Sequence, residues 1–587
     1  MDKKVKININ GVDILADQGD TILKAAEKNH IFIPRLCFLK DVHEEGNCRI
    51  CSVKVEGQKN LKPSCKTIVT EGMKVITDDQ EVYDNVTLNL ELLTHRHQFE
   101  CFKCSRENNC EFLDLLRRYS IDNEYTNSYG PCDLDFYHYQ DESKVMVIDS
   151  SKCILCGRCV SACEKYSGLS VLHFNERGNK TYVGPALFHD IADSGCIYCG
   201  KCIGACPTGA IKGYDYVKQM ERDLRDSNKK IVVQVAPAVR AALGEEFGYP
   251  IGTNVEGKMF SALKKLGVDE IMDTNFTADL TIMEEGTELI HRLEHGGKFP
   301  MFTSCSPGWI NLLELYYPEF IPNLSSCKSP QQMAGALIKT YYAEKMEVDP
   351  KNIVSVSIMP CIAKKAEAQR KEMGRDGYQD VDYVLTTREF ARLIRRRGID
   401  FRNLEDSKPY GMLASYTGAA TIFGATGGVM EAALRTVSEI LENKSTPIEF
   451  KQVRGNADIK EATYKIADMD LNVAVVHGGV AILEFLEIIK ENPTKYHFVE
   501  FMGCTGGCIN GGGQPIVKAI DQERYDVRSL RASVLYDIDQ KNELRKSHQN
   551  EYVLKLYEDF LEKPYSKKAH DLLHTKYHKR EAYNDVE

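Results

Sequence analysis

The chain has 587 residues, of which 43% are apolar and 27% charged, with a formal net charge of −10 and a mean hydropathy of −0.35. This length is too great for one hydrophobic core and predicts roughly three to five domains. The negative charge argues against binding to nucleic acid or anionic membranes, and no stretch reaches the roughly 18 to 20 apolar residues that a membrane span requires.

The cysteines are distributed unevenly along the chain. Sixteen of the 21 precede residue 210, mostly at CxxC-type spacings, and five are scattered beyond residue 300. Residues 1–16 lack the apolar core and cleavage site of a signal peptide, so we expect a cytoplasmic protein, in which disulfides are rare. Thiolates at two- and three-residue spacings suit metal–sulfur clusters. The early cysteines therefore predict an electron-transfer chain that serves a site formed by the late ones.

Residues 1–80 are predicted to be rich in β-strand. Residues 5–9 alternate in polarity, Asn10 and Gly11 form a tight-turn dipeptide, and a short helix is expected over residues 21–28. The spacing C-x10-C-x2-C-x13-C follows, which suits a 2Fe–2S cluster although the first gap is longer than in plant-type ferredoxins. The four candidate ligands are Cys37, Cys48, Cys51 and Cys65.

A helical pattern over residues 86–93 leads into a second group of candidate ligands. This group consists of His97, Cys101, Cys104 and Cys110. Three cysteines and one histidine suit either a zinc ion or a His-ligated 4Fe–4S cluster. The position of this group between two other iron–sulfur motifs favours the cluster.

The strongest local pattern is a cysteine run that occurs twice, with the two-cluster spacing of bacterial ferredoxins. In that pattern the fourth cysteine of each run ligates the cluster of the other run. One 4Fe–4S cluster is therefore assigned to Cys153, Cys156, Cys159 and Cys206. The other is assigned to Cys163, Cys196, Cys199 and Cys202.

The remainder of the chain is typical of an α/β protein. Apolar runs at residues 232–235, 353–358 and 473–476 alternate with helical stretches, which predicts mostly parallel sheets in two lobes. We expect a helix to begin at Pro237. Cys361 and Cys504 directly follow predicted strands, at the sheet edge where such proteins bind ligands.

Three segments of this region contain four of the five late cysteines. They read TSCSPGW at residues 303–309, MPCIAKK at 359–365 and MGCTGGCINGGGQP at 502–515. These resemble the signature segments of FeFe-hydrogenases, and the resemblance, closest to the clostridial ferredoxin-linked type, extends over essentially the whole chain. It implies a multidomain α+β and α/β fold. The expected domains are a β-grasp ferredoxin domain (1–80), a small His/Cys cluster domain (81–126), a two-cluster ferredoxin-like domain (127–213) and a two-lobed α/β H-cluster domain (214–587).

The resemblance implies reversible reduction of protons to H2 at an H-cluster, a 4Fe–4S cubane bridged by cysteine to a diiron unit with CO, cyanide and azadithiolate. Cys361, Cys504 and Cys508 match the cubane ligands, with Cys508 as the bridge, and the glycines at 511–513 are expected to let backbone approach the cofactor. One 2Fe–2S and three accessory 4Fe–4S clusters complete the set. The implied partners are a ferredoxin or flavodoxin-type carrier and the H-cluster maturation proteins.

The resemblance also assigns roles around the diiron unit. Residues matching its pocket are Ala236, Pro237, Pro330, Gln331, Met359, Phe423 and Met502. Lys364 matches a lysine placed against a cyanide. The residues matching the proton relay are Cys305, Glu285, Ser325, Glu288 and Arg292. From the residues alone, the methionines could be core fillers, the lysine a surface cation, and the glutamates one face of a solvated helix.

One position departs from the family pattern. The first segment normally reads TSCCP, and Ser306 occupies the place of its second cysteine, the usual fourth cubane ligand. Three arrangements are open: Ser306 ligates iron, Cys327 reaches the iron instead, or Cys305 ligates and no longer donates protons. The alternative functions are a hydrogen-sensing or low-turnover relative and an electron-transfer protein without the diiron unit. The complete third segment and the relay residues favour the hydrogenase.

Overall fold

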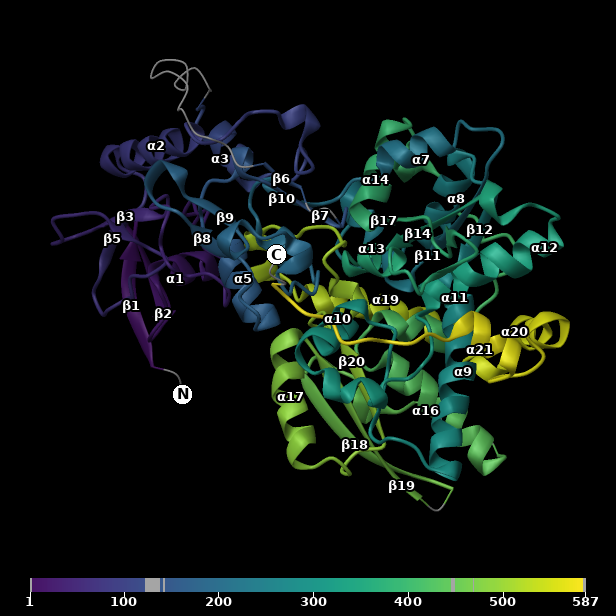
Figure 1. Cartoon of the computed structure of the whole chain (residues 1–587). Helices are drawn as coiled ribbons and strands as arrows, with labels where there is room; N and C mark the ends of the chain where they lie inside the picture. The colour runs from purple at the N-terminus through teal and green to yellow at the C-terminus, as the bar shows by residue number, and fades with distance from the viewer. Residues whose placement is uncertain (1–2, 122–137, 141–142, 445–448, 468, 584–587) are drawn as a thin grey trace.

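The computed structural model describes residues 3–121, 138–140, 143–444, 449–467 and 469–583 (Figure 1). Its mixture of ferredoxin-like N-terminal regions and a larger α/β region confirms the predicted fold class. Cys132, for which the sequence suggests no ligand role, lies outside the described residues. Within these ranges no helix is both long and apolar enough to cross a membrane.

The N-terminal region is built on a five-stranded sheet with the order β2-β1-β5-β3-β4. The predicted turn at Asn10 and Gly11 joins the first two strands, and both residues have positive φ, at 52° and 83°. Thr21 caps helix α1 (Ile22–Lys28) by accepting a hydrogen bond from the amide of Lys24. The strands are β1 (Lys4–Ile9), β2 (Val12–Asp17), β3 (Ser52–Val55), β4 (Lys62–Pro63) and β5 (Lys74–Ile76).

The next two regions are mainly short helices and strands around cysteine-rich loops. Gly157 and Gly200, which directly precede two of the helices, have left-handed φ values of 86° and 70°. The helices are α2 (Gln80–Thr94), α3 (Glu111–Arg118), α5 (Arg158–Ser167) and α6 (Lys201–Ala205). A small sheet has the order β10-β7-β6 and consists of β6 (His138–Gln140), β7 (Met146–Asp149) and β10 (Ile211–Gly213).

Arg158 joins these N-terminal regions to one another. Its guanidinium is 1% exposed and forms a two-bonded ion pair with Glu111, at 2.9 and 3.0 Å. It also donates to the carbonyls of Cys37 at 3.2 Å and Phe38 at 2.8 Å. One side chain thus ties the loop of Cys37 to α3 and α5, and fixes the distance between their cysteine groups.

We expect Arg158→Leu to destabilise the N-terminal regions by about 3–5 kcal/mol, because it leaves Glu111 buried without a counter-charge. Loss of the visible iron–sulfur absorption on heating should occur at lower temperature than in the wild type. The double variant Arg158→Leu/Glu111→Leu removes both charges and should recover part of the loss. If the double variant is no more stable than the single one, the ion pair is not the cause.

The larger region contains the two predicted lobes, each with its own sheet (Figure 1). The first sheet, ordered β12-β11-β14-β17, is parallel throughout, and in the second only the β18–β19 pair is antiparallel. The first lobe contains β11 (Lys230–Val235), β12 (Glu270–Asp273), β14 (Ile353–Met359) and β17 (Tyr383–Thr386). The second contains β13 (Met301–Phe302), β18 (Ile459–Ile466), β19 (Met469–His477) and β20 (Phe498–Met502).

Helix α9 (Thr274–His295) links the two lobes. It follows β12 of the first lobe, begins at the capping carboxylate of Asp273, and packs against α16 (Gly428–Glu442) of the second. Most of its length is buried, so its polar side chains must find partners inside the protein. The helix expected at Pro237 is a single 3-10 turn, Pro237–Val239.

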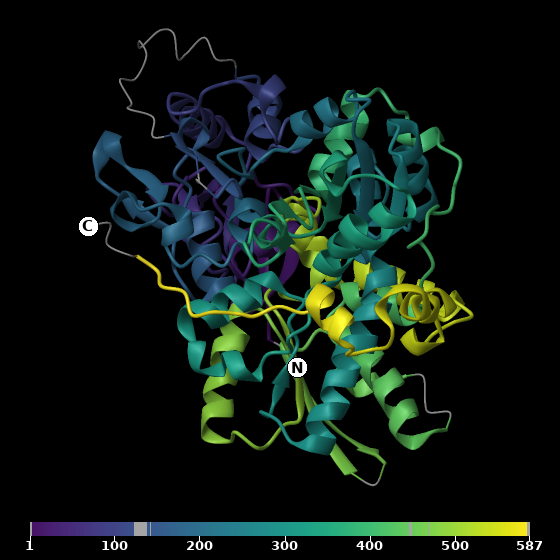
Figure 2. The same ribbon diagram turned by 45° about the vertical axis from the view of Figure 1, so that its right-hand side comes forward.

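The end of the described chain crosses the molecule. After helix α21 (Lys567–Leu573), residues 574–583 run from the larger α/β region back toward the two-cluster region, as the yellow segment in Figure 2 shows. The amides of Arg580 and Tyr583 donate to the carbonyls of Glu314 and Asp193 along this path. The segment therefore joins the larger α/β region to the two-cluster region.

Candidate functional site

The three signature segments meet because each follows the carboxyl end of a strand: β13, β14 and β20. The amide of Gly503 in the third segment donates to Ser306 Oγ of the first at 3.0 Å. The amide of Gly513 donates to the carbonyl of Pro360 in the second segment at 2.7 Å. The segments are thus held to one another by bonds from backbone amides, which makes their side-chain geometry rigid.

A cavity of about 80 Å³ lies where the segments meet. All seven residues predicted to form the diiron pocket line it, as do Cys305, Ser306, Cys361, Lys364, Cys504 and Cys508. Other elements of the two lobes also contribute to the wall, through Ala238, Thr274, Ala278 and Gly424. The structure therefore assembles in one place the residues that the sequence places up to 272 positions apart, from Ala236 to Cys508.

The lining of this cavity fits an iron–sulfur group attached to a bulky, mainly apolar one. Burial raises the pKa of Cys508 to about 12, with Cys504 adding to the shift, and burial together with Cys504 and Cys508 raises the pKa of Cys361. Several buried thiols this close together can be deprotonated at the same time only if a metal ion neutralises their charge. The aliphatic and aromatic remainder of the wall, including Met359, Phe423 and Met502, offers packing rather than hydrogen bonds.

Ser306 lies on this wall, whereas Cys327 does not. Ser306 precedes α10 (Pro307–Tyr316) without capping it, so its hydroxyl is available to the cavity while it accepts the Gly503 bond. The sulfur of Cys327 faces Glu288 Oε2 at 4.0 Å and His574 Nδ1 at 3.9 Å instead. Of the three arrangements for the fourth ligand, the structure disfavours the one that uses Cys327.

The glycines at 511–513 allow close contacts between backbone segments, and Gly511 also lines the cavity. A Cβ on Gly511 would lie 2.3 Å from the carbonyl oxygen of Pro360, and one on Gly512 would lie 2.5 Å from that of Cys199. These positions need glycine because protein backbone approaches closely. Gly512 in particular allows the third signature segment to contact the two-cluster region.

Lys364 points into the site from helix α13 (Ala363–Ala368). Its ammonium donates to the carbonyl of Cys305 at 3.2 Å, to Ser329 Oγ at 2.8 Å and to Glu367 at 2.8 and 3.1 Å. Gln331 also donates to Glu367, at 2.9 Å, while its own Oε1 has no partner among the described residues. Glu367 thus holds both the cation and the amide in place at the cavity wall.

The second residue of the predicted proton relay, after Cys305, is Glu285 of α9. Both of its oxygens are buried without a hydrogen-bond partner of good geometry among the described residues. Burial, and secondarily Glu288, raises the pKa of Glu285 to about 8, although Ser325 and the Ser304 amide face it and oppose the shift. Its carboxyl group is therefore neutral at pH 7 and carries a proton that it can transfer.

The outer half of the relay is connected by hydrogen bonds. Glu288 Oε2 accepts from Ser325 Oγ at 3.1 Å, and Glu288 Oε1 accepts from Arg292 at 2.5 Å. Arg292 is partly exposed, at 13% of its side-chain surface. Ser325, Glu288 and Arg292 thus form a hydrogen-bonded set that ends at a partly exposed side chain, while Cys305 lies on the cavity wall. The acidic face of this helix is buried, which excludes a solvated helix.

The predicted cysteine groups of the N-terminal regions also converge. The amide of Cys37 donates to the sulfur of Cys48 at 3.4 Å, and the sulfurs of Cys51 and Cys65 lie 3.3 Å apart. Three small cavities each bring four predicted ligands together. Their ligand sets are His97 with Cys101, Cys104 and Cys110; Cys153 with Cys156, Cys159 and Cys206; and Cys163 with Cys196, Cys199 and Cys202.

His97 is oriented as a metal ligand would be. Its Nδ1 is 3.1 Å from the carbonyl of Lys152, which fixes Nδ1 as the donor and leaves Nε2 for a ligand. Burial lowers the pKa of the imidazole to about 4, so the ring is neutral. The hydroxyl of Thr208, 3.5 Å from the sulfur of Cys206, donates to the same carbonyl, which connects this group to the next one.

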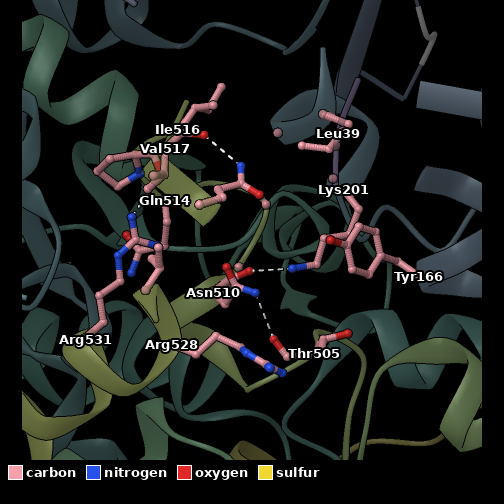
Figure 3. Close-up of a pocket in the computed structure, with 18 of the residues that line it drawn as sticks. Leu39, Tyr166, Lys201, Thr505, Asn510, Gln514, Ile516, Val517, Arg528 and Arg531 are labelled. Atoms are coloured by element: carbon pink, nitrogen blue, oxygen red, sulfur yellow. Dashed lines mark hydrogen bonds between the residues drawn. The ribbon is translucent and has the colours of Figure 1, made fainter. Parts of the chain in front are cut away.

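A larger cavity, of about 610 Å³, separates part of the N-terminal regions from the third signature segment (Figure 3). Lys201 reaches across its wall and donates to the carbonyl of Asn510 at 2.8 Å, and the Asn510 amide donates to the carbonyl of Thr505 (Figure 3). Lys201 directly precedes Cys202, so this bond joins a proposed accessory cluster to the segment that contains Cys508.

Sequence reasoning missed three residues of the site. Glu367 could have been suspected because it lies three residues after Lys364, on the same helix face. The amide of Ser326 donates to Glu288 Oε2 at 3.0 Å, and Ser326 directly follows the predicted relay residue Ser325. His574, which is 2.8 Å from Ser326 Oγ through Nδ1, gave no signal because 248 positions separate the two.

Family models match most of the chain. They describe the C-terminal domain of the iron-only hydrogenase large subunit (residues 229–512), the iron hydrogenase small subunit (525–580), a 2Fe–2S iron–sulfur cluster binding domain (2–80) and a 4Fe–4S dicluster domain (152–210). Iron hydrogenase 1 of Clostridium pasteurianum is 45% identical, across 98% of this chain and 100% of its own. The NADP-reducing hydrogenase subunit HndD of Solidesulfovibrio fructosivorans is 42% identical, across 98% and 99%.

Solved structures agree with this assignment. A variant of the FeFe-hydrogenase HydA1 from Chlamydomonas reinhardtii is 39% identical and aligns with a TM-score of 0.55, over 62% of this chain and 99% of its own. That alignment and the near full-length sequence matches point to the same conclusion. The chain belongs to the FeFe-hydrogenase family.

Proposed function

We propose that this protein catalyses the reversible reduction of protons to H2 in the cavity formed by the three signature segments. The observation that supports this most strongly is the convergence of Cys361, Cys504, Cys508 and the whole predicted diiron pocket on one buried cavity. A relay of protonatable groups leads from the same cavity toward the surface. An electron-transfer protein without the diiron unit would need neither the pocket nor the relay.

In this proposal Cys361, Cys504, Cys508 and Ser306 hold the cubane of the H-cluster, with Cys508 as the bridge to the diiron unit. When bound, the H-cluster would supply the redox chemistry that interconverts protons and H2, with electrons delivered through the N-terminal regions. The aliphatic pocket residues position the diiron unit and exclude water. Lys364, fixed by Glu367 and Ser329, presents a cation to an anionic ligand of that unit.

Protons reach the site through the chain's own side chains. Cys305 holds a proton at Sγ, because burial and secondarily the carboxyl of Glu285 raise its pKa well above its usual value. Glu285 replaces that proton, and Glu288 recharges Glu285 through the hydroxyl of Ser325. Arg292 holds the outer carboxylate at the protein surface. Each group thus transfers a proton to the next without bulk water entering the cavity.

Electrons enter through the N-terminal regions. We propose one 2Fe–2S cluster at Cys37, Cys48, Cys51 and Cys65, one 4Fe–4S cluster at the His97 group, and two at the ferredoxin-type cysteine sets. The cluster at Cys163, Cys196, Cys199 and Cys202 is the last before the H-cluster, since Lys201 and Gly200 contact the third segment. A ferredoxin or flavodoxin-type carrier in the cytoplasm is the proposed partner, and dedicated maturation proteins are proposed to insert the diiron unit.

The test is infrared spectroscopy of the matured protein combined with an assay of H2 evolution from a reduced carrier. We expect CO and cyanide stretching bands together with turnover. Bands without turnover would instead identify a hydrogen-sensing relative. Failure to observe any such band after maturation would contradict the proposed H-cluster.

The relay predicts an alkaline limit to H2 evolution. Because the pKa of Glu285 is raised to about 8, its proton is present below that pH and is lost as the pH rises through it. The rate should therefore fall above about pH 8. Glu285→Gln should lower the rate by about 10²–10⁴-fold at every pH. Glu294→Gln, exposed near the end of the same helix, is the matched control and should keep the wild-type pH profile.

A further inference from the structure

A second group of metal-binding side chains lies beside the proton relay and outside the cavity. It consists of Glu288 on α9, Cys327 in the loop before α11 (Pro330–Leu337), and His574 directly after α21. One ligand atom of each lies within 4.8 Å of the others, and all three residues are buried. An isolated β-bridge between Cys327 and His574 fixes their backbones side by side.

The separations are close to those of a coordinated ion. The sulfur of Cys327 is 4.0 Å from Glu288 Oε2 and 3.9 Å from His574 Nδ1. Ligand atoms at about 2.0–2.3 Å from a tetrahedral zinc ion lie roughly 3.3–3.8 Å from one another. The two separations from the sulfur therefore need to contract by only a few tenths of an ångström, and the carboxylate and imidazole atoms lie within 4.8 Å of one another. The hydroxyl of Ser326, 3.1 Å from the carboxylate and 2.8 Å from the imidazole, lies where a fourth ligand would.

The surroundings of the group favour a cation. His574 Nε2 lies 3.0 Å from the carboxylate of Glu284 and donates to it, which leaves Nδ1 as an acceptor that faces the Ser326 hydroxyl at 2.8 Å and the Cys327 sulfur at 3.9 Å. Burial, and then the nearby carboxyl groups of Glu288, Glu285 and Glu284, raise the pKa of the Cys327 thiol. The only cation bonded to Glu288 among the described residues is Arg292, and it contacts the other oxygen, Oε1. A positive ion at the thiol would thus relieve an excess of negative charge.

The geometry points to an inhibitory site for a thiophilic divalent cation, with Zn²⁺ the best match, at Glu288, Cys327 and His574. Binding joins the ion to a thiolate, an imidazole and a carboxylate, and it releases the thiol proton to solvent. Glu288 Oε2 is the oxygen that Ser325 contacts, so coordination there interrupts proton transfer. The inhibition rests on the proposed function, whereas the binding itself does not.

The histidines of α21 offer a path from solvent to this site. His570 is exposed, and its ring stacks on that of His574 with centroids 4.7 Å apart. Tyr565 packs edge-on against both rings. An ion that binds at His570 is therefore separated from the buried ligands only by the stacking distance between the His570 and His574 rings.

Zinc content and H2 evolution of the matured full-length protein test the inference. The proteins compared are the wild type, Cys327→Ala, His574→Gln and the control His30→Gln, whose side chain is exposed in the N-terminal region. After exposure to ZnCl2 and desalting, the wild type and the control should retain one more zinc per chain than the other two. Each rate is expressed relative to the same protein without zinc. Inhibition of Cys327→Ala and His574→Gln should require at least about tenfold more zinc.

Several outcomes would overturn the site. Equal zinc retention by all four proteins would exclude it, as would loss of iron in parallel with zinc uptake, which indicates exchange at the clusters. Different zinc retention with equal inhibition would exclude the inhibitory role. If the wild type evolves no H2 without zinc, the proposed function fails, while zinc retention still decides whether the site exists.

Discussion

Replacing Cys305 with serine should lower the rate of H2 evolution by about 10²–10⁴-fold while cluster content stays at the wild-type level. The thiol of Cys305 is the only protonatable side chain of the proposed relay that lines the cavity. A serine hydroxyl is much less acidic than a thiol. It therefore cannot replace the thiol as a proton donor at a comparable rate. The measurements are H2 evolution from a reduced carrier, iron content and infrared bands.

Ser304→Ala is the matched control for this variant. Its hydroxyl donates to the carbonyl of Cys327 at 2.6 Å and not to a relay group, so most of the rate should remain. A serine variant with normal turnover would show that protons arrive by another route. A serine variant without infrared bands would show instead that Cys305 is needed to hold the cofactor, as it would if it were the fourth cubane ligand.

The convergence of the N-terminal cysteine groups was predictable because most members of each group lie close together in the sequence. The CxxC-type spacings place several sulfurs within one or two turns of the chain. These sulfurs therefore lie close together regardless of how the rest of the chain folds. The strands around residues 232, 353 and 473 were predictable for a similar reason, since buried parallel strands are continuous apolar runs. The structure confirms these elements with small changes at their ends.

Contacts between distant parts of the chain could not be read from spacing. Nothing near Cys327 in sequence indicates that His574 will lie beside it, because only the path of the C-terminal segment brings them together. The resemblance to the family located the pocket and relay residues, but it offered no account of Glu367, which holds Lys364 and Gln331. It also could not reveal that the glycine run serves backbone contact with Pro360 and Cys199.

Replacing Ser306 with alanine should remove most of the H2 turnover, whereas Ser306→Cys should retain it with an altered cubane. Ser306 lines the cavity beside the three cysteines, and its hydroxyl is oriented by the amide of Gly503. Alanine leaves one iron without a protein ligand, which should reduce cubane content and with it the attachment of the diiron unit at Cys508. The measurements are iron content, infrared bands and turnover of each variant.

The cysteine variant also predicts the direction of a change in potential. An alkoxide is a harder donor than a thiolate and favours the more oxidised iron, so Ser306→Cys should raise the reduction potential of the cubane. Electron flow from the neighbouring cluster at Cys199 then becomes more favourable, which should shift the balance of turnover between H2 evolution and uptake. A redox titration of the three proteins, followed by electron paramagnetic resonance, measures the effect. Identical cubane spectra and potentials in the wild type, alanine and cysteine variants would show that position 306 is not a ligand, and would leave Cys305 as the residue that completes the cubane.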